Sequence, residues 1–354
     1  MTRRSVLVAM SGGVDSSVAA AVLVAAGYEV VGVTMKMHDA PEVRGAKHGC
    51  CTVEDADDAR AVAAQLGIAH YTLDMSAPFA RSVVDAFVEG YAAGRTPNPC
   101  VECNRHVKFT ELIDRADSLG VDMVATGHHA RLRDGHLVRG ADRAKDQSYV
   151  LACLELDTLG RVLLPVGDMT KAEVRTTAER LGLRTAGKAD SMEVCFLGAG
   201  GAAAFVAERV PVAPGPALAP DGAVVGTHRG AELYTVGQRR GIESPLNRRL
   251  YVHATDIASN TVTVDTDPPL ADSLTADGAV WARDTPAEFD ATVQTAAHGR
   301  AAPARVSRGE AGRVGVEFTA SVSAPAAGQL AAIYDGDVVV GSATVTGSLR
   351  RRRR

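Results

Sequence analysis

Three cysteines are placed where their thiols could carry sulfur or bind a metal. Cys100 and Cys103 form a Cys-x-x-Cys pair in GRTPNPCVECN, whose two prolines stiffen the backbone, and Cys195 lies in MEVCFLG. Asn104 is expected to begin a helix, so Cys103 would lie at a helix N-terminus, where the macrodipole favours thiolate over thiol. Because the thiolate is the form that attacks sulfur, the pattern predicts a reactive Cys103.

A second segment, SGGVDSS at residues 11–17, has the composition of a phosphate-binding loop. Two glycines let the backbone turn sharply and approach a ligand closely. Backbone N–H groups and the hydroxyls of Ser11, Ser16 and Ser17 would then face an anion at a helix N-terminus. The segment contains no lysine, so it is not the GxxxxGK[ST] phosphate loop.

The elements that must position these residues alternate between strand and helix in the first half of the chain. The predicted elements are 5–10, 15–26, 28–34, 54–66, 70–73, 76–93 and 123–126. This alternation is typical of an α/β fold with a parallel sheet covered on both faces. Asp134-Gly135 predicts a hairpin over 131–139, and Thr170 with Glu173 predicts a capping box.

The second half of the chain reads as β-rich. Four prolines between 211 and 220 mark a junction, and short apolar runs separated by turn residues follow it. These runs are 223–226, 250–255, 261–265, 290–294, 313–319 and 330–346. Their length and spacing predict a small C-terminal β-barrel.

The composition is that of a globular protein with a sizeable core. Of its 354 residues, 46% are hydrophobic and 23% are charged, and the net charge is −4. This composition excludes intrinsically disordered and fibrous proteins. No apolar run is long enough to span a membrane, and the apolar N-terminus reads as a strand rather than a signal peptide. Six cysteines in so long a chain do not form a disulfide scaffold, and a reducing cytoplasm is expected.

The loop resembles the SGGxDS loop of the ATP pyrophosphatases, and further motifs make the resemblance more specific. SGGVDSS, GRTPNPCVECN, ATGHHA, KDQSYVL, MEVCFLG and LYTVGQRRG occur in this order. The same order is found in the family of tRNA-specific 2-thiouridylases, which the chain resembles densely from residue 5 to about 255. The resemblance implies an ATP-pyrophosphatase catalytic domain (1–205), a central α+β domain (206–272), a C-terminal tRNA-binding β-barrel (273–349) and a disordered arginine tail (350–354).

The implied activity is that of a tRNA-uridine 2-sulfurtransferase. ATP would adenylate the C2 oxygen of the wobble uridine in the tRNAs for Lys, Glu and Gln, and a cysteine persulfide would then deliver sulfur. The products would be 2-thiouridine, AMP and pyrophosphate. A cysteine desulfurase or a sulfur-relay protein is implied as the persulfide donor, and no membrane partner is expected.

The resemblance also assigns the site residues. Cys103 would be the nucleophile and Cys195 the persulfide carrier, and the two could form a disulfide after sulfur release. Asp15 would hold Mg²⁺, a hard ion that prefers oxygen ligands. The implied ATP contacts are Ala9, Met10, Ser11, Gly12, Gly13, Val14, Asp15, Ser16, Met35 and Gly127. The implied tRNA contacts are Asn98, Pro99, His128, Lys145, Asp146, Gln147 and Gln329.

The chain departs from the family pattern at three places. Cys100 replaces an aspartate that has acid–base work in the family, so Cys100 is a candidate catalytic residue. Ala9 replaces a glycine, and Ala296-Ala297 replaces an Arg-Tyr pair that contacts tRNA. With Cys100, the chain has three thiols that could hold a [4Fe–4S] cluster, and cluster chemistry stays open beside the persulfide route.

Two other classes of protein share some of these features. An ATP-dependent synthetase or amidotransferase has the same loop and would depend on ammonia, but it does not need the paired cysteines. A non-catalytic tRNA-binding module explains the β-rich region but not an intact phosphate loop. Pyrophosphate release that depends on tRNA separates both from the thiolating enzyme.

Overall fold

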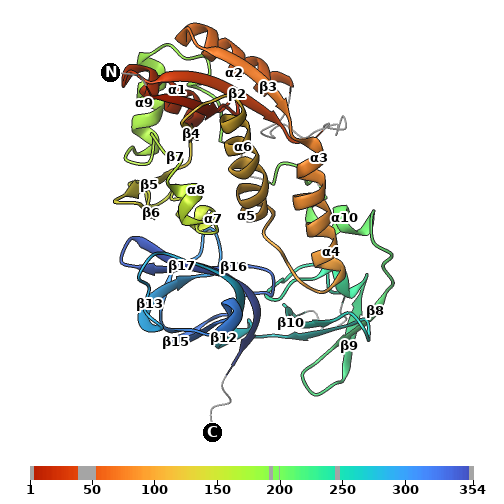
Figure 1. Cartoon of the computed structure of the whole chain (residues 1–354). Coiled ribbons are helices and arrows are strands. Elements are labelled where there is room, and N and C mark those ends of the chain that lie inside the picture. The colour runs from red at the N-terminus through yellow and green to blue at the C-terminus, as the bar shows by residue number, and fades with distance from the viewer. Residues whose placement is uncertain (1–3, 39–52, 191–193, 199, 244–247, 351–354) are drawn as a thin grey trace. The chain divides into compact units, whose positions relative to one another are not determined.

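The computed structural model describes residues 4–38, 53–190, 194–198, 200–243 and 248–350. The described residues fold into two compact units (Figure 1). The first unit comprises 1–83, 100–196 and 337–339, and the second comprises 84–99, 197–336 and 340–354, each within the described ranges. Cys50, Cys51 and the last four arginines lie outside the described residues.

The first unit is built on a parallel sheet with the strand order β3-β2-β1-β4-β7. These strands are β1 (Ser5–Ala9), β2 (Glu29–Lys36), β3 (Ala69–Asp74), β4 (Met123–Ala125) and β7 (Val162–Leu163). The central strand β1 is apolar because it is covered on both faces, and Val6, Leu7 and Val8 are fully buried. The predicted α/β fold and its first four strands are confirmed, whereas the two-residue strand β7 was not predicted.

Helix α1 forms the centre of the helical layer beside this sheet. It runs over Val14–Ala25 and packs against α2 (Val53–Leu66) and α9 (Lys171–Arg180). Its small residues Ala19 and Ala20 are fully buried, which lets the helix lie close to its neighbours. The predicted capping box opens α9, since Glu173 accepts from the Thr170 N–H at 2.7 Å and donates its own N–H to the Thr170 hydroxyl.

The predicted hairpin is also present in the first unit. Strands β5 (Ala130–Arg133) and β6 (His136–Arg139) pair in antiparallel fashion, and both Asp134 and Gly135 have positive φ, as a type I′ turn requires. Val138 of β6 pairs with Val338, and Asp337 forms ion pairs with Arg131 and Arg143. Two short helices follow the hairpin, α7 (Ser148–Leu151) and α8 (Leu156–Leu159).

A long helical run crosses the division between the two units. It consists of α3 (Ser76–Phe79), a π-helical segment η1 (Ala80–Asp85) and α4 (Ala86–Ala92). Pro78 lies in its first turn, where a missing N–H removes no helical hydrogen bond. The predicted helix over 76–93 is confirmed.

The second unit contains a four-stranded sheet and a barrel. The sheet has the order β10-β11-β8-β9, with β8 (Gly215–Leu218), β9 (Val224–His228), β10 (Tyr251–Asp256) and β11 (Thr261–Asp265). Helix α10 (Gly201–Ala207) and the single turn η3 (Ala231–Leu233) pack against each other.

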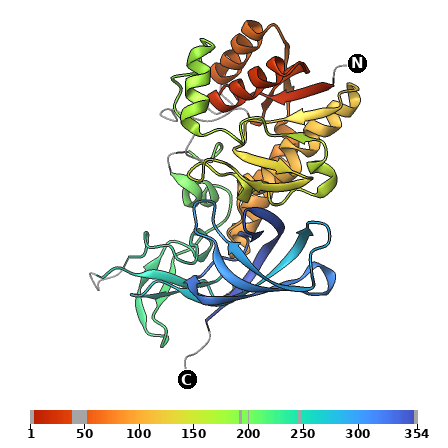
Figure 2. The ribbon, with the colours of Figure 1, turned by 90° about the vertical axis from the view of Figure 1, so that its left-hand side faces the viewer.

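The barrel strands close on themselves, as the β-rich pattern predicts. Pairing runs in the order β12-β15-β14-β13-β16-β17, and β17 also pairs with β12. Figure 2 shows the strands of this C-terminal region, in blue, as a curved sheet. The strands are β12 (Leu270–Trp281), β13 (Glu288–Gln294), β14 (Ala302–Arg308), β15 (Val314–Ser323), β16 (Leu330–Asp335) and β17 (Val338–Leu349), with the turn η4 (Glu310–Gly312) before β15. Alternate residues such as Val293, Val306 and Val316 fill the interior.

Within the part of the chain that the structure describes, every helix is too short or too polar to cross a lipid bilayer.

Candidate active site

The SGGVDSS segment connects β1 to α1 and turns sharply at Gly12. Gly12 has φ +71°, and a Cβ at this position would lie 2.2 Å from the carbonyl oxygen of Asp55. Only glycine fits here, because any side chain would both strain the backbone and collide with α2. The first N–H groups of α1 have no intrahelical acceptor, so the loop presents them as the predicted anion site.

The three serine hydroxyls of the loop have different roles. Ser16 and Ser17 are buried, and their hydroxyls donate to the Gly13 carbonyl at 3.1 and 2.8 Å. The prediction that all three hydroxyls face a ligand is therefore wrong for Ser17, whose side chain is fully buried and holds the loop in shape. Ser11 is the exposed member, and its N–H donates to the Ser16 hydroxyl at 3.1 Å.

The remaining predicted nucleotide contacts lie at the carboxyl ends of the strands beside β1. Met35 is near the end of β2, and Gly127 follows β4. Gly127 approaches α1 so closely that a Cβ on it would lie 2.5 Å from the Ser16 nitrogen. Strand β1 lies between β2 and β4, so the sheet is extended from β1 in one direction by β2 and in the other direction by β4. Ligands of open α/β sheets bind at such switch points.

Asp15, in the first turn of α1, is held by a lysine and a histidine. Lys171 Nζ donates to both carboxylate oxygens at 2.8 Å, and His129 Nε2 lies 3.1 Å from Oδ1. Burial opposes ionisation of Asp15, but the hydrogen bonds from His129 and Lys171 outweigh it and keep the pKa of the carboxyl below its usual range. Asp15 is therefore ionised at neutral pH.

Asp190 forms ion pairs with three cationic side chains, one of which is the Lys171 that also binds Asp15. Its carboxylate accepts from Lys145, Lys171 and Arg175, each at 2.8 Å. Burial raises the pKa of Asp190, but the hydrogen bonds from Lys145 and Lys171 outweigh it and lower the value to about 2. Because Lys171 bridges Asp15 and Asp190, the cluster sets cationic groups beside the phosphate loop, where a polyanion would bind.

Sequence reasoning missed Lys171, Arg175 and Asp190 as site residues. The scarcity of lysine, which singles out Lys145 in the sequence, applies equally to Lys171, since only six lysines occur in the chain. The capping box explains why a helix starts at Lys171, but a sequence pattern does not show that this start packs against α1. Tertiary contact between α9 and α1 makes the lysine part of the site.

His128 is predicted to contact tRNA, and its surroundings favour the neutral imidazole. Burial, reinforced by the charge of Lys108, lowers the pKa of His128 to about 3. Its Nδ1 lies 2.8 Å from the Thr126 hydroxyl, which fixes the ring. A neutral ring forms no ion pair with a phosphate, so it is suited to hydrogen bonding with a base or a ribose.

Asp146 and Gln147 of the KDQ motif use their side chains inside the first unit. The Asp146 carboxylate accepts from Arg139, from the Gly140 N–H and from both the N–H and the hydroxyl of Ser148. Gln147 Oε1 accepts from the His129 N–H at 2.8 Å. Gln147 thus holds the backbone at His129, and Lys145 is the member of the motif that reaches the cation cluster.

The predicted start of the helix that carries Cys103 is wrong. The helical run begins at Pro99, since α5 covers Pro99–Cys103, the π-helical segment η2 covers Asn104–Lys108 and α6 covers Thr110–Ser118. Proline suits the first helical position, and the buried Asn104 donates its amide to the Val150 carbonyl at 3.3 Å instead of capping a helix. Cys100 therefore lies in the first turn, and Cys103 lies inside the run.

The three candidate thiols differ in exposure. Cys100 is exposed, Cys195 is half-buried and Cys103 is 7% exposed. A fourth thiol, Cys153, is buried at 1% exposure, and burial raises its pKa to about 12, so it stays protonated and acts as core packing, as predicted.

The segments that carry Cys195 and Cys103 share a neighbour in the first unit. Phe196 packs edge-on against Phe79 of α3, with ring centroids 5.8 Å apart. Helix α3 in turn packs against η2, which begins directly after Cys103. Met192 and Glu193, which come before Cys195 in the MEVCFLG motif, lie outside the described residues.

The other predicted tRNA contacts, Asn98, Pro99 and Gln329, belong to the second unit. Asn98 is half-buried and Pro99 is buried. Gln329 precedes β16, and its amide Nε2 donates to the Thr96 carbonyl at 2.7 Å. The carbonyls of Ala296 and Ala297, at the place of the missing Arg-Tyr pair, accept from Gln294 at 2.9 and 3.2 Å.

Comparison with known proteins agrees with this architecture. A tRNA methyl transferase HUP domain model matches residues 4–199, a tRNA methyl transferase PRC-barrel domain model matches 203–266, and an aminomethyltransferase β-barrel domain model matches 271–345. A tRNA-specific 2-thiouridylase MnmA of Thermobifida fusca is 46% identical over 99% of this chain and 97% of its own length. The chain belongs to the tRNA-specific 2-thiouridylase MnmA family.

Further members of the MnmA family match at the same level. The protein of Sorangium cellulosum is 48% identical, covering 98% of this chain and 93% of its own length. The protein of Salinispora arenicola is also 48% identical, covering 96% of this chain and 98% of its own length. The likeness therefore extends through both units, including the barrel.

The described side chains of this MnmA family member form no preassembled metal centre. Both oxygens of Asp15, the predicted Mg²⁺ ligand, accept from the Lys171 ammonium. Across residues 4–38, 53–190, 194–198, 200–243 and 248–350, no three His, Cys, Asp or Glu side chains converge as metal ligands. Cys100, Cys103 and Cys195 all lie in these ranges, and they are not brought together as the [4Fe–4S] alternative requires.

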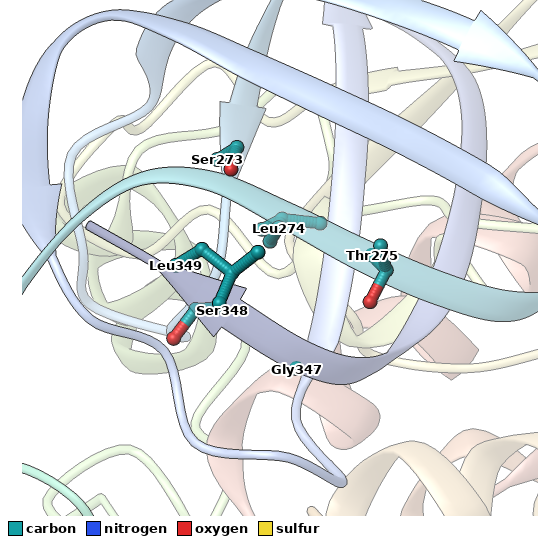
Figure 3. Close-up of a pocket in the computed structure, with 6 residues that line it drawn as sticks. All are labelled: Ser273, Leu274, Thr275, Gly347, Ser348 and Leu349. Carbon is teal, nitrogen blue, oxygen red and sulfur yellow. The ribbon is translucent and has the colours of Figure 1, made fainter. Parts of the chain in front are cut away.

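A pocket of about 200 Å³ lies in the second unit. It is lined by residues of two paired barrel strands, Ser273–Thr275 of β12 and Gly347–Leu349 of β17 (Figure 3). The lining offers serine and threonine hydroxyls, with no thiol and no titratable group. It therefore has no groups for the chemistry predicted here.

Proposed function

We propose that this chain is a tRNA-uridine 2-sulfurtransferase, which thiolates C2 of the wobble uridine in the tRNAs for Lys, Glu and Gln. The observation that carries the proposal is the phosphate loop with its Asp15–Lys171 pair, in the same unit as the helix that bears Cys103. The named relatives are tRNA-specific 2-thiouridylases and cover nearly the whole chain. These relatives support thiolation of a tRNA uridine as the overall activity, which we propose takes place in two chemical steps.

The first step is adenylation of the uridine. The C2 carbonyl oxygen attacks the α-phosphate of ATP, the bond between the α- and β-phosphates breaks, and pyrophosphate leaves. The N–H groups of the loop at Gly12 and Gly13 and the cation of Lys171 stabilise the charge that moves onto the departing pyrophosphate. Adenylation turns a poor leaving group, the carbonyl oxygen, into AMP.

The second step is sulfur transfer through two cysteines. The terminal sulfur of a persulfide on Cys195 attacks C2, and AMP is expelled. The Cys103 thiolate then attacks the inner sulfur of Cys195, which releases the terminal sulfur to the base as the C2 thiocarbonyl and leaves a Cys103–Cys195 disulfide. A thiol reductant must reopen this disulfide before a sulfur donor, a cysteine desulfurase or a relay protein, forms the next persulfide.

The tRNA is proposed to meet the first unit through Lys145 and His128. Lys145 supplies a cation for a phosphate, and it is already oriented by Asp190. His128 is neutral and offers a hydrogen bond to the displaced base rather than an ion pair. Asn98 and Pro99 are proposed to form a stiff wall against that base, and Asp146 and Gln147 to hold Lys145 and the histidines in place.

Purified protein, ATP, unmodified tRNA and a persulfide donor test the proposal. We expect pyrophosphate release that requires tRNA, followed by 2-thiouridine in the tRNA. Pyrophosphate release without tRNA but with ammonia would instead indicate a synthetase or amidotransferase. Binding of tRNA with no pyrophosphate release would indicate a non-catalytic module.

A further inference from the structure

His129 is a buried histidine of the first unit, located between β4 and β5. Its side chain is only 4% exposed, and its Nε2 lies 3.1 Å from Oδ1 of Asp15. Within the part of the chain that the structure describes, the other ring nitrogen, Nδ1, has no hydrogen-bond partner. An ionised carboxylate can only accept, so Nε2 carries a proton and donates it to Asp15.

The backbone that carries this ring is held at both of its polar groups by Gln147. The His129 N–H donates to Gln147 Oε1 at 2.8 Å, and the Gln147 N–H donates to the His129 carbonyl at 2.9 Å. Gly140 packs against the same carbonyl so closely that a Cβ on it would lie 2.5 Å from the oxygen. Because its backbone is fixed in this way, the ring has a defined direction toward Asp15.

Asp15 passes this orientation on to Lys171. Both oxygens of Asp15 accept from the Lys171 ammonium at 2.8 Å, and the same ammonium also lies 2.8 Å from Asp190. Two carboxylates therefore share one cation beside the phosphate loop. The terminal carboxylate of an aspartate rotates easily about its last bond, so a donor on Oδ1 is needed to keep both oxygens turned toward the lysine. His129 is that donor.

We propose that His129 is a positioning residue of the ATP site, which orients the Asp15 carboxylate and through it the Lys171 ammonium, while Gln147 fixes its backbone. The proposal rests on the proposed function for the identity of ATP as the ligand. It uses only the amide oxygen and the main chain of Gln147, so the implied contact of this residue with tRNA stands unchanged. The alternative is that the buried ring is core packing, which would affect stability but not ATP.

Three variants of the full chain separate these two roles. His129→Phe keeps a ring in the site and removes the N–H donor, whereas His129→Gln restores an amide N–H at about the reach of Nε2. His106→Phe is the matched control, because His106 Nε2 also lies near a carboxylate of the first unit, 3.3 Å from Glu102 at a more exposed place. The Kd for ATP is measured by titration calorimetry without tRNA, and the free energy of unfolding by urea.

We expect His129→Phe to weaken ATP binding about tenfold or more, because it removes a hydrogen bond to a charged group. His129→Gln should bind ATP within about threefold of the parent chain, since it keeps a donor for the carboxylate. His106→Phe should change the Kd for ATP less than about twofold, as expected for an exposed pair. In turnover, His129→Phe should raise KM for ATP about tenfold and change KM for tRNA less than about twofold.

A different pattern would overturn the proposal. If His129→Phe binds ATP as tightly as His106→Phe and loses only free energy of unfolding, His129 is core packing. If His129→Phe does not fold, Gln147→Ala decides, because it removes the acceptor for the His129 N–H and should also weaken ATP binding in the absence of tRNA. If the ATP affinities respond as expected but no tRNA is thiolated by the parent chain, the proposed function fails while the positioning role stands.

Discussion

Lys171 donates to both carboxylate oxygens of Asp15 at 2.8 Å, joining the first turn of α9 to the first turn of α1. A carboxylate that the sequence suggested as a metal ligand thus faces an ammonium group next to the phosphate loop. The lysine has side-chain exposure of only 12%, so its charge acts in a poorly solvated setting. There it stabilises both Asp15 and any phosphate bound at the loop.

This arrangement makes Lys171 a sensitive position for turnover. Lys171→Met keeps the length of the side chain and removes the charge, and we expect tRNA-dependent pyrophosphate release to fall about 100-fold, as with loss of a charge-stabilising donor. Lys171→Arg should retain more activity than Lys171→Met, because it keeps the charge. Equal activity of Lys171→Met and the parent chain would show that the lysine has no part in the ATP step.

Asp190 should contribute more to stability than an ordinary surface aspartate. It pairs with three cations at 24% side-chain exposure, whereas Asp168 pairs with Arg133 alone at 56% exposure. We expect Asp190→Asn to lower the free energy of unfolding by about 2–4 kcal/mol and Asp168→Asn by less than about 1 kcal/mol at pH 7. Urea unfolding measures both, and equal losses would contradict the role of the cation cluster.

Gly12 should tolerate no side chain. Gly12→Ala adds a Cβ that would lie 2.2 Å from the Asp55 carbonyl oxygen, whereas Gly67, with φ +69°, has nothing within 4 Å of such a Cβ. Gly67→Ala should therefore cost only the backbone strain of about 1–2 kcal/mol. Gly12→Ala should cost about 1–3 kcal/mol more, for the collision with α2, and should abolish ATP binding. Thermal unfolding and ATP titration of the two variants check this.

His128 predicts a pH effect on stability. Its pKa is about 3 when folded and about 6.5 when unfolded, so between these values the unfolded chain binds the extra proton and stability falls as pH falls. From pH 7.5 to 5.5, this histidine alone should remove about 1.4 kcal/mol. His128→Gln should lose less stability than the parent chain over this range. An identical loss in both chains would mean that the folded histidine titrates normally.

The first unit was largely predictable from sequence, because its strands are apolar runs and its turns carry glycine. The hairpin at Asp134-Gly135 and the capping box at Thr170 are local features, and local chemistry determines both. In the barrel, β12 and β14 were not predicted, because Asp272, Asp277 and Arg305 interrupt the apolar alternation on the solvent side. Strand β8 was not predicted either, because Gly215 and Pro216 read as turn residues.

The site was predictable where function depends on a local motif and not where it depends on tertiary contact. The phosphate loop is a single segment, and its geometry follows from Gly12. The cation cluster joins Lys145, Lys171 and Asp190 from three segments, so no window of sequence contains it. The helix start at Pro99 was misjudged because Asn104 is a good cap in isolation, while its amide is used by Val150 in the fold.

Thionucleoside analysis tests sulfur transfer to tRNA through Cys103 and Cys195. tRNA would be analysed from cells in which this gene replaces the native thiouridylase, with Cys103→Ser, Cys195→Ser, Cys100→Ser and Cys153→Ser side by side. We expect 2-thiouridine with the parent chain, Cys100→Ser and Cys153→Ser, and none with Cys103→Ser or Cys195→Ser. Loss of 2-thiouridine in Cys100→Ser as well, with iron in the purified protein, would contradict the persulfide route. Absence of 2-thiouridine with the parent chain would contradict the thiolation itself.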